Sequence, residues 1–183
     1  MSRTCIFLAN GFETIEALTV VDMLRRAREE ITTVSITGER EVISSHKVPV
    51  TADAVFQEMD YDSIDVLVLP GGMPGTTNLA SCKELLELVK KHYEQGKLVA
   101  AICAAPSILG ELSLLKGKRA CCFPGYEEKL HGAFVTYNET EADGNIITAR
   151  GMGTSIAFGA EILKKTAGED VADHILKKIV YRQ

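Results

Sequence analysis

The chain has 183 residues, of which 46% are hydrophobic and 25% charged, and these values are typical of a soluble globular protein with one core. Its formal charge of −5 and its pI near 5.4 argue against a protein that binds nucleic acid generally or attaches to an anionic membrane, because both need a concentrated basic surface. We therefore expect one domain over residues 1–183, with neither of these partners.

The N-terminal stretch M-S-R-T-C-I-F-L-A-N-G has an apolar run too short for a signal peptide, so we expect a cytoplasmic protein. The five cysteines show no C-x-x-C spacing, and this pattern predicts neither a disulfide framework nor a zinc site. We expect reduced thiols and no bound metal.

Short apolar runs alternate with longer amphipathic runs along the chain. In the first half the patterns predict these elements: a strand over 4–9, a helix over 13–27, a strand over 31–37, a β-rich excursion over 41–50 and a buried strand over 65–69. In the second half they predict a helix over 81–95, a strand over 97–102, a helix after Cys103, strands over 119–123, 133–137 and 145–149, and helices over 153–166 and 169–180.

Near-continuous apolar strands separated by helices are typical of a mostly parallel sheet covered on both faces. The prediction is an α/β doubly wound sandwich. In such folds, sites form outside the carboxyl ends of the strands, where the strand order reverses. The segments that could carry chemistry are therefore 9–16, 70–78 and 103–107.

Cys103 follows the strand in V-A-A-I-C-A-A-P, at the start of a helix. A side chain on such a turn is exposed over the sheet edge, as in a nucleophile elbow. The helix N-terminus lowers the pKa of a thiol, so we expect Cys103 to be the most acidic of the five. The alternative is that Cys103 is a small buried hydrophobic residue.

Residues 10–16 read N-G-F-E-T-I-E. Asn10 and Glu13 have the spacing of a capping box, which explains Glu13. Glu16 shares an apolar helical stripe with Val20 and Met23, so burial would raise the pKa of its carboxyl group and keep it protonated. The alternative is that Glu16 reaches solvent at the edge of the stripe.

Two glycine-rich segments could bind an anion through backbone N–H groups. In L-P-G-G (69–72) the glycines let the backbone approach a ligand, although Pro-Gly-Gly is also an ordinary turn. G-M-G-T (151–154) opens a helix and is a weaker signal.

Several motifs together resemble the ThiJ/PfpI superfamily, in the branch of the Parkinsonism-associated protein deglycase. They are N-G-F-E-T-I-E-A, V-D-M-L-R-R-A, D-V-L-V-L-P-G-G, V-A-A-I-C-A-A-P and T-A-R-G-M-G-T-S, in this order and spacing over the whole chain. The resemblance implies a flavodoxin-like fold, a homodimer and no cofactor.

The resemblance also implies roles for individual residues. Cys103 would be the nucleophile and redox-sensitive thiol, Glu16 its protonated partner, and Gly72 and Ala104 the oxyanion donors through their backbone N–H groups. Further candidate residues of the pocket are Gly71, His46, Phe123, Arg150 and Gly151.

Four positions separate this sequence from related patterns. Phe123 stands where the branch often has a histidine, His46 where it has an arginine and Met152 where it has a proline. Ala104 replaces the histidine that follows the cysteine in the PfpI proteases, which argues against a peptidase.

The resemblance implies a cysteine-dependent, cofactor-independent glyoxalase or deglycase. Its substrates would be glyoxal, methylglyoxal or early glycation adducts, and it would protect against carbonyl and oxidative stress. The alternative is a non-enzymatic redox sensor or chaperone that works through oxidation of Cys103.

Overall fold

A seven-stranded sheet runs through the centre of the molecule in the computed structural model, which describes residues 2–182. Its strand order is β10-β11-β7-β6-β1-β2-β5, and only the edge strand β10 is antiparallel to its neighbour. The strands are β1 (Arg3–Leu8), β2 (Glu30–Ser35), β5 (Ala54–Val55), β6 (Val66–Leu69), β7 (Leu98–Ile102), β10 (Thr140–Asp143) and β11 (Ile146–Ala149).

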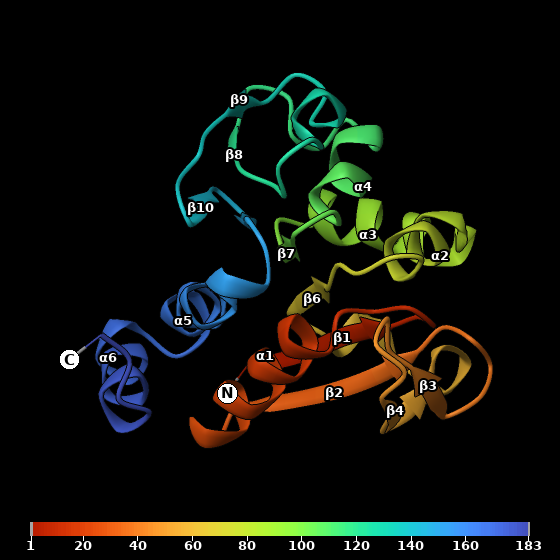
Figure 1. The fold of residues 1–183 in the computed structure, drawn as a ribbon, viewed down its shortest axis with the longest axis horizontal. Helices are drawn as coiled ribbons and strands as arrows, with labels where there is room; N and C mark the ends of the chain where they lie inside the picture. Colours follow the sequence, from red (N-terminus) through yellow and green to blue (C-terminus); the bar gives the residue numbers. More distant parts are fainter. Residues whose placement is uncertain (1, 183) are drawn as a thin grey trace.

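Helices cover both faces of this sheet (Figure 1). One face packs against α1 (Thr14–Arg26), α5 (Ser155–Thr166) and α6 (Glu169–Lys178). The other packs against α2 (Gly75–Ser81), α3 (Lys83–Glu94) and α4 (Pro106–Glu111). Every residue of β6 and β11 is buried, because side chains on both faces of these strands enter a core. The predicted doubly wound α/β sandwich is confirmed.

Smaller elements surround the sheet. The hairpin β3 (Glu41–Ile43) and β4 (Pro49–Thr51) is antiparallel, and β8 (Arg119–Ala120) pairs in parallel with β9 (Phe134–Val135). Single 3-10 turns lie at Phe56–Glu58, Tyr61–Ser63, Glu127–Lys129 and Met152–Thr154. None of the helices within residues 2–182 combines the length and the apolar character needed to cross a bilayer.

Three details differ from the sequence predictions. The helix predicted over 81–95 is two helices that meet at Cys82, and α2 extends back to Gly75. The strand β10 was not predicted, because its sequence, T-E-A-D, is too polar to show a strand pattern. Polar residues are tolerated in this strand because it lies at the edge of the sheet, open to solvent on one side. Asn10 is not a helix cap: its Oδ1 accepts from the N–H of Ile43, while Glu13 caps α1 by accepting from the N–H of Ile15.

The strand order reverses at β1. The chain passes outward through β2 and β5, then returns to the other side of β1 and continues through β6, β7 and β11. The carboxyl ends of β1, β6 and β7 therefore meet beside the reversal point, which is where the sequence predicted the site.

Candidate active site

Cys103 lies on a sharp turn between β7 and α4. Its φ of +66° is in the left-handed region that residues other than glycine rarely adopt, and its N–H donates to the carbonyl oxygen of Ala149 at 2.9 Å. The turn leaves the side chain half-buried rather than enclosed in the core. The predicted elbow is present, and strain at such a position is common in functional sites.

Glu16 comes from the first turn of α1 and is 1% exposed, on the same buried stripe as Val20 and Met23. Its Oε2 accepts from the N–H of Gly71 at 2.9 Å, and a methyl group at Gly71 would lie 2.7 Å from this oxygen and 3.0 Å from Cys103 Sγ, so the two side chains lie side by side. Its Oε1 is buried without a partner among the described residues. Burial raises the pKa of Glu16 to about 7, so the carboxyl group is a proton donor or acceptor near neutral pH.

The thiol of Cys103 is not acidic as the sequence predicted. Burial, followed by the charge and hydrogen bonding of Glu16, raises the pKa of Cys103 to about 12. The backbone N–H groups of Gly72 and Ala104 lower the pKa of the thiol but do not overcome burial. The effect of Glu16 requires an ionised carboxylate, so protonation of Glu16 removes it.

Two glycines directly after Pro70 allow the backbone at the end of β6 to approach Cys103 and Glu16. A methyl group at Gly71 would lie 2.6 Å from Cys103 Cβ and 2.7 Å from Glu16 Oε2. Gly72 has a φ of +90°, and a methyl group there would lie 2.3 Å from the nitrogen of Glu13. The Pro-Gly-Gly segment therefore does more than turn the chain: it brings two backbone N–H groups to Glu16 and Cys103.

A cavity of about 390 Å³ opens above Cys103. Its lining residues come from five segments: Glu13, Ser45, His46, Gly72, Met73, Cys103, Ala104, Phe123 and Tyr126. Phe123 is fixed at the elbow by its N–H, which donates to the carbonyl oxygen of Cys103 at 2.8 Å. The cavity is therefore largely apolar around the sulfur.

His46 belongs to the turn between β3 and β4, and its side chain is 84% exposed. Its Nδ1 lies 3.1 Å from Ser45 Oγ and 3.8 Å from Glu13 Oε2. Ser45 in turn donates to Glu13 Oε2 at 3.3 Å. The predicted pocket residue His46 thus lies at the mouth of the cavity.

Of the two candidate residues in the segment T-A-R-G-M-G-T-S, Gly151 lies at the site and Arg150 does not. A methyl group at Gly151 would lie 3.2 Å from the Phe123 ring and 4.0 Å from Glu16 Oε1, so Gly151 lies beside these two residues, although it does not line the cavity. Arg150 does not line the cavity, and its guanidinium lies 5.8 Å from the ring centroid of Tyr137. Its prediction as a pocket residue therefore has no support in the cavity geometry.

Sequence reasoning missed four lining residues: Glu13, Ser45, Met73 and Tyr126. Met73 follows the Pro-Gly-Gly signal directly and could have been included with it. Ser45 and Tyr126 lie in irregular segments whose position depends on tertiary contacts. Among residues 2–182, no group of three or more His, Cys, Asp or Glu side chains is arranged to hold a metal ion.

Comparisons with known proteins show the family to which this chain belongs. Protein DJ-1 homolog B of Arabidopsis thaliana is 35% identical over 182 residues, which cover 98% of this chain and 42% of that protein. The chain thus spans less than half the length of the Arabidopsis relatives. A deglycase of Pyrococcus abyssi is 33% identical over 166 residues, covering 88% of this chain and 98% of that protein.

A solved structure, that of oxidized DJ-1 from Toxoplasma gondii, matches with a TM-score of 0.95 at 28% identity, covering 100% of both chains. The family model described as the DJ-1/PfpI family matches residues 2–165, which include Glu16, the Pro-Gly-Gly segment and Cys103. This chain is therefore a member of the DJ-1/PfpI family.

Proposed function

We propose that this protein is a cysteine-dependent, cofactor-independent enzyme that converts 2-oxoaldehydes such as glyoxal and methylglyoxal, free or in early glycation adducts, to hydroxy acids. The observation that carries the proposal is the carboxyl group of Glu16, buried against the sulfur of Cys103 with a pKa raised to about 7. A group with that pKa both takes and gives a proton at neutral pH. The deglycase activity in the name of the Pyrococcus relative adds support.

The first step forms a bond between sulfur and the aldehyde carbon. Ionised Glu16 takes the thiol proton as Cys103 attacks, which explains how a thiol with a raised pKa can act as a nucleophile. Glu16 then gives this proton to the carbonyl oxygen, which becomes the hydroxyl of a hemithioacetal and leaves the carboxylate ionised again. We assign the N–H groups of Gly72 and Ala104, which favour the thiolate form of Cys103, to the stabilisation of the developing oxyanion.

The second step moves a proton between neighbouring carbons. Glu16 removes the proton from the carbon bound to sulfur and returns a proton to the former ketone carbon, while the hydroxyl proton passes to the former ketone oxygen, which leaves a thioester on Cys103. Water then cleaves the thioester and releases the hydroxy acid and the thiol. The aldehyde carbon is oxidised and the ketone carbon is reduced, so the reaction needs no external oxidant or reductant.

The alternative function is a redox sensor. Peroxide would oxidise Cys103 to the sulfinate in two steps, each transferring one oxygen atom and releasing water. Protonated Glu16 and the N–H groups of Gly72 and Ala104 would donate to the sulfinate oxygens. The Toxoplasma relative, which was solved in an oxidized form, keeps this alternative open.

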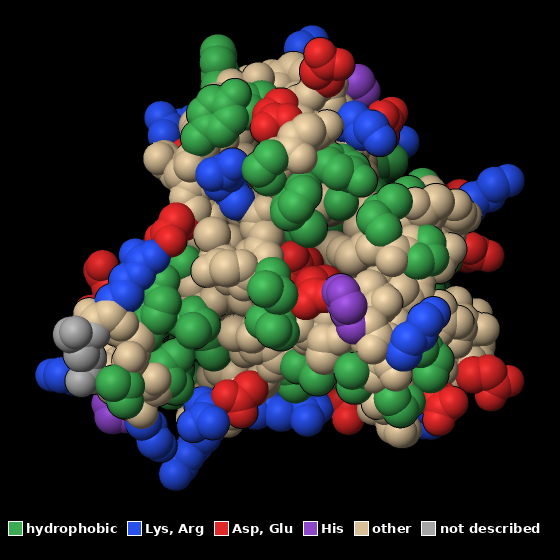
Figure 2. Space-filling view, viewed as in Figure 1, with side chains coloured by type: hydrophobic (Ala, Val, Ile, Leu, Met, Phe, Trp, Pro, Cys, Tyr) green, Lys and Arg blue, Asp and Glu red, His purple; other side chains and the backbone are tan. Residues whose placement is uncertain are grey.

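A second copy of this chain is the proposed partner. Large hydrophobic side chains gather over the face formed by α1, α5 and α6 (Figure 2). Ile15 on α1 is 48% exposed, beside a groove of about 480 Å³ that Leu18 and Ile156 also line. Asp22 and Arg26 on the same helix form an ion pair at its edge, so the face has an apolar centre and a charged rim.

Turnover separates the enzyme from the sensor. Protein treated with a chelator is mixed with a large excess of methylglyoxal, and the appearance of lactate is followed by NMR. We expect many equivalents of lactate from the wild type, background formation from Cys103→Ala, and wild-type formation from Cys82→Ala, which removes a different partly buried thiol. A single equivalent of modified protein without lactate would favour the sensor.

A further inference from the structure

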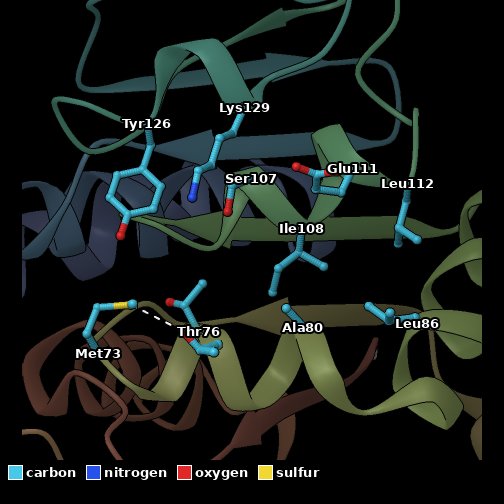
Figure 3. Close-up of a pocket in the computed structure, with 11 residues that line it drawn as sticks. Met73, Thr76, Ala80, Leu86, Ser107, Ile108, Glu111, Leu112, Tyr126 and Lys129 are labelled. Carbon is cyan, nitrogen blue, oxygen red and sulfur yellow. Dashed lines mark hydrogen bonds between the residues drawn. The ribbon is translucent and has the colours of Figure 1, made fainter.

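A second cavity lies beside the one above Cys103, and nothing in the proposed reaction of methylglyoxal uses it. Its volume is about 310 Å³, near the lower limit of about 300 Å³ for small-molecule sites. It lies between α2 and α4 and is closed by the segment that carries Tyr126 and Lys129 (Figure 3). Its apolar lining consists of Met73, Ala80, Leu86, Ile108, Leu112 and the ring of Tyr126.

The two cavities share a wall. Met73 and Tyr126 line both of them, and Figure 3 shows these two side chains on opposite sides of one end of the second cavity. A molecule held by Cys103 could therefore extend between Met73 and Tyr126 into the second cavity. Methylglyoxal, with a single methyl group beyond its two carbonyl carbons, is too small to occupy both.

A buried hydroxyl group in this cavity lacks a partner. Thr76 on α2 is 5% exposed, and its Oγ1 makes no hydrogen bond with the described residues. Ser107 on α4, by contrast, donates to the carbonyl oxygen of Ala104 at 2.7 Å. An unpartnered buried hydroxyl is costly, and a ligand oxygen that accepts from Thr76 would remove the cost.

Charge at the rim favours an uncharged occupant. Lys129 and Glu111 are both exposed and have opposite signs. The ammonium group of Lys129 lies 5.0 Å from the ring centroid of Tyr126, and Glu111 Oε1 lies 3.3 Å from His131 Nε2. The cavity therefore offers no net charge to a ligand, and its affinity has to come from apolar contact and Thr76.

We propose that this second cavity binds the tail of a larger 2-oxoaldehyde: an uncharged group about the size of a phenyl ring, with one oxygen that accepts from Thr76. The inference rests on the proposed function, since Cys103 would hold the aldehyde carbon. The overall reaction stays balanced, with one water added to the 2-oxoaldehyde to give the 2-hydroxy acid. The tail takes no part in the chemistry and contributes binding alone.

Binding is tested without turnover, using products as probes. The methyl signals of Met73, Ile108 and Leu112 are followed by NMR during titration with 4-hydroxymandelate, mandelate and lactate. We expect 4-hydroxymandelate to shift them at concentrations about tenfold below those that lactate needs, because only the former has a tail to bury. Equal effects of lactate and 4-hydroxymandelate would overturn the proposal.

Two variants and one control locate the site. Ala80→Phe fills the cavity with a ring and should abolish the shifts, whereas Ser81→Phe adds the same ring on the same helix outside the cavity and should keep them. Thr76→Val keeps the shape and removes the donor, so it should weaken 4-hydroxymandelate about twofold to tenfold and leave mandelate unchanged. Unchanged binding in Ala80→Phe and Thr76→Val would contradict the assignment.

Kinetics then distinguish the failure of this inference from failure of the proposed function. Ala80→Phe should lower kcat/KM for 4-hydroxyphenylglyoxal about tenfold and leave kcat/KM for methylglyoxal unchanged. Equal kcat/KM values for 4-hydroxyphenylglyoxal in Ala80→Phe and wild type would contradict the proposed binding of the tail but not the proposed enzyme activity. If neither substrate is converted, the enzyme proposal fails and the binding titration alone decides whether the cavity takes this ligand.

Discussion

Glu16 and Cys103 lie together in a site that water only partly reaches, and each changes the protonation of the other. Burial favours the neutral form of both groups, so the pKa of Glu16 rises to about 7 and that of Cys103 to about 12. Ionised Glu16 adds to the effect of burial in keeping the thiol protonated. This dependence can be measured at each residue separately.

Replacing Glu16 by glutamine should lower the pKa of Cys103. The amide carries no charge, so the pKa of the thiol falls toward the value set by burial and by the N–H groups of Gly72 and Ala104. The pH dependence of alkylation by iodoacetamide, followed by mass spectrometry of the Cys103 peptide, should give a lower thiol pKa in Glu16→Gln than in wild type. The Cys82 peptide is the internal control, and an unchanged or higher pKa of Cys103 would contradict the coupling.

Glu16 should also make stability depend on pH. Its pKa rises from 4.5 in the unfolded chain to about 7 in the fold, so the native state binds the proton more tightly. The stabilisation is complete below the unfolded pKa of 4.5 and is lost as the pH rises to about 7, by about 3 kcal/mol over this window. The free energy of unfolding in urea should fall by this amount between pH 4.5 and 7 in wild type but not in Glu16→Gln. The same pH dependence of the unfolding free energy in both proteins would refute this prediction.

At the scale of elements, the site depends on how closely β6 approaches the elbow after β7. Gly71 is the point of contact, because any side chain there would meet both Cys103 and Glu16. The hydrogen bond from the Gly71 N–H to Glu16 Oε2, 2.9 Å long, fixes α1 against β6 at the same point. One small residue therefore sets the separation of the two reactive side chains.

Gly71→Ala should separate this pair. The added methyl group is 2.6 Å from Cys103 Cβ, so the elbow or α1 has to move, at a cost of about 1–3 kcal/mol. We expect a lower unfolding midpoint in urea and a large loss of lactate formation. Gly153→Ala is the matched control, since no atom lies within 4 Å of its added methyl group. Equal losses in the two variants would show that Gly71 has no special role.

Periodicity and turn residues were sufficient to predict most elements and the edge of the sheet where the site lies. Cys103 after an apolar strand and Glu16 on an apolar stripe were found because each breaks a simple pattern in a way that burial explains. The capping role of Asn10 was wrong, since its side chain bonds Ile43, 33 residues away. The thiol pKa was also wrong, because the helix N-terminus is visible in the sequence and the desolvation of the sulfur is not.

At the scale of the whole molecule, the cavity above Cys103 and the hydrophobic face over α1 are both formed by segments that lie far apart in the sequence. The lining of the cavity joins segments from residue 13 to residue 126, and no local pattern could have placed Ser45 and Tyr126 together. The face over α1 is continuous only because α5 and α6 pack beside it. Sequence patterns could suggest α1 as an interface, but not the groove that Ile156 and Ile179 complete.

The dimer should depend on this face. A glutamate at position 15 or 18 would place a charge in the apolar groove, so the double variant Ile15→Glu, Leu18→Glu should sediment as a monomer at micromolar concentrations where wild type sediments as a dimer. Lys90→Glu on the exposed side of α3 is the control for added negative charge. Wild-type protein sedimenting at a mass of 19.9 kDa would contradict the proposed partner.

The proton transfer by Glu16 is the step on which the proposed function depends, and solvent deuterium tests it most directly. Methylglyoxal is incubated in D2O with chelator-treated wild type, Glu16→Gln and Cys103→Ala, and lactate is followed by NMR. We predict that wild type forms lactate with deuterium at its second carbon, that Glu16→Gln is slower by about 10²- to 10⁴-fold, and that Cys103→Ala forms none above background. Lactate formation by Glu16→Gln at the wild-type rate, or its absence with the wild type, would contradict the account.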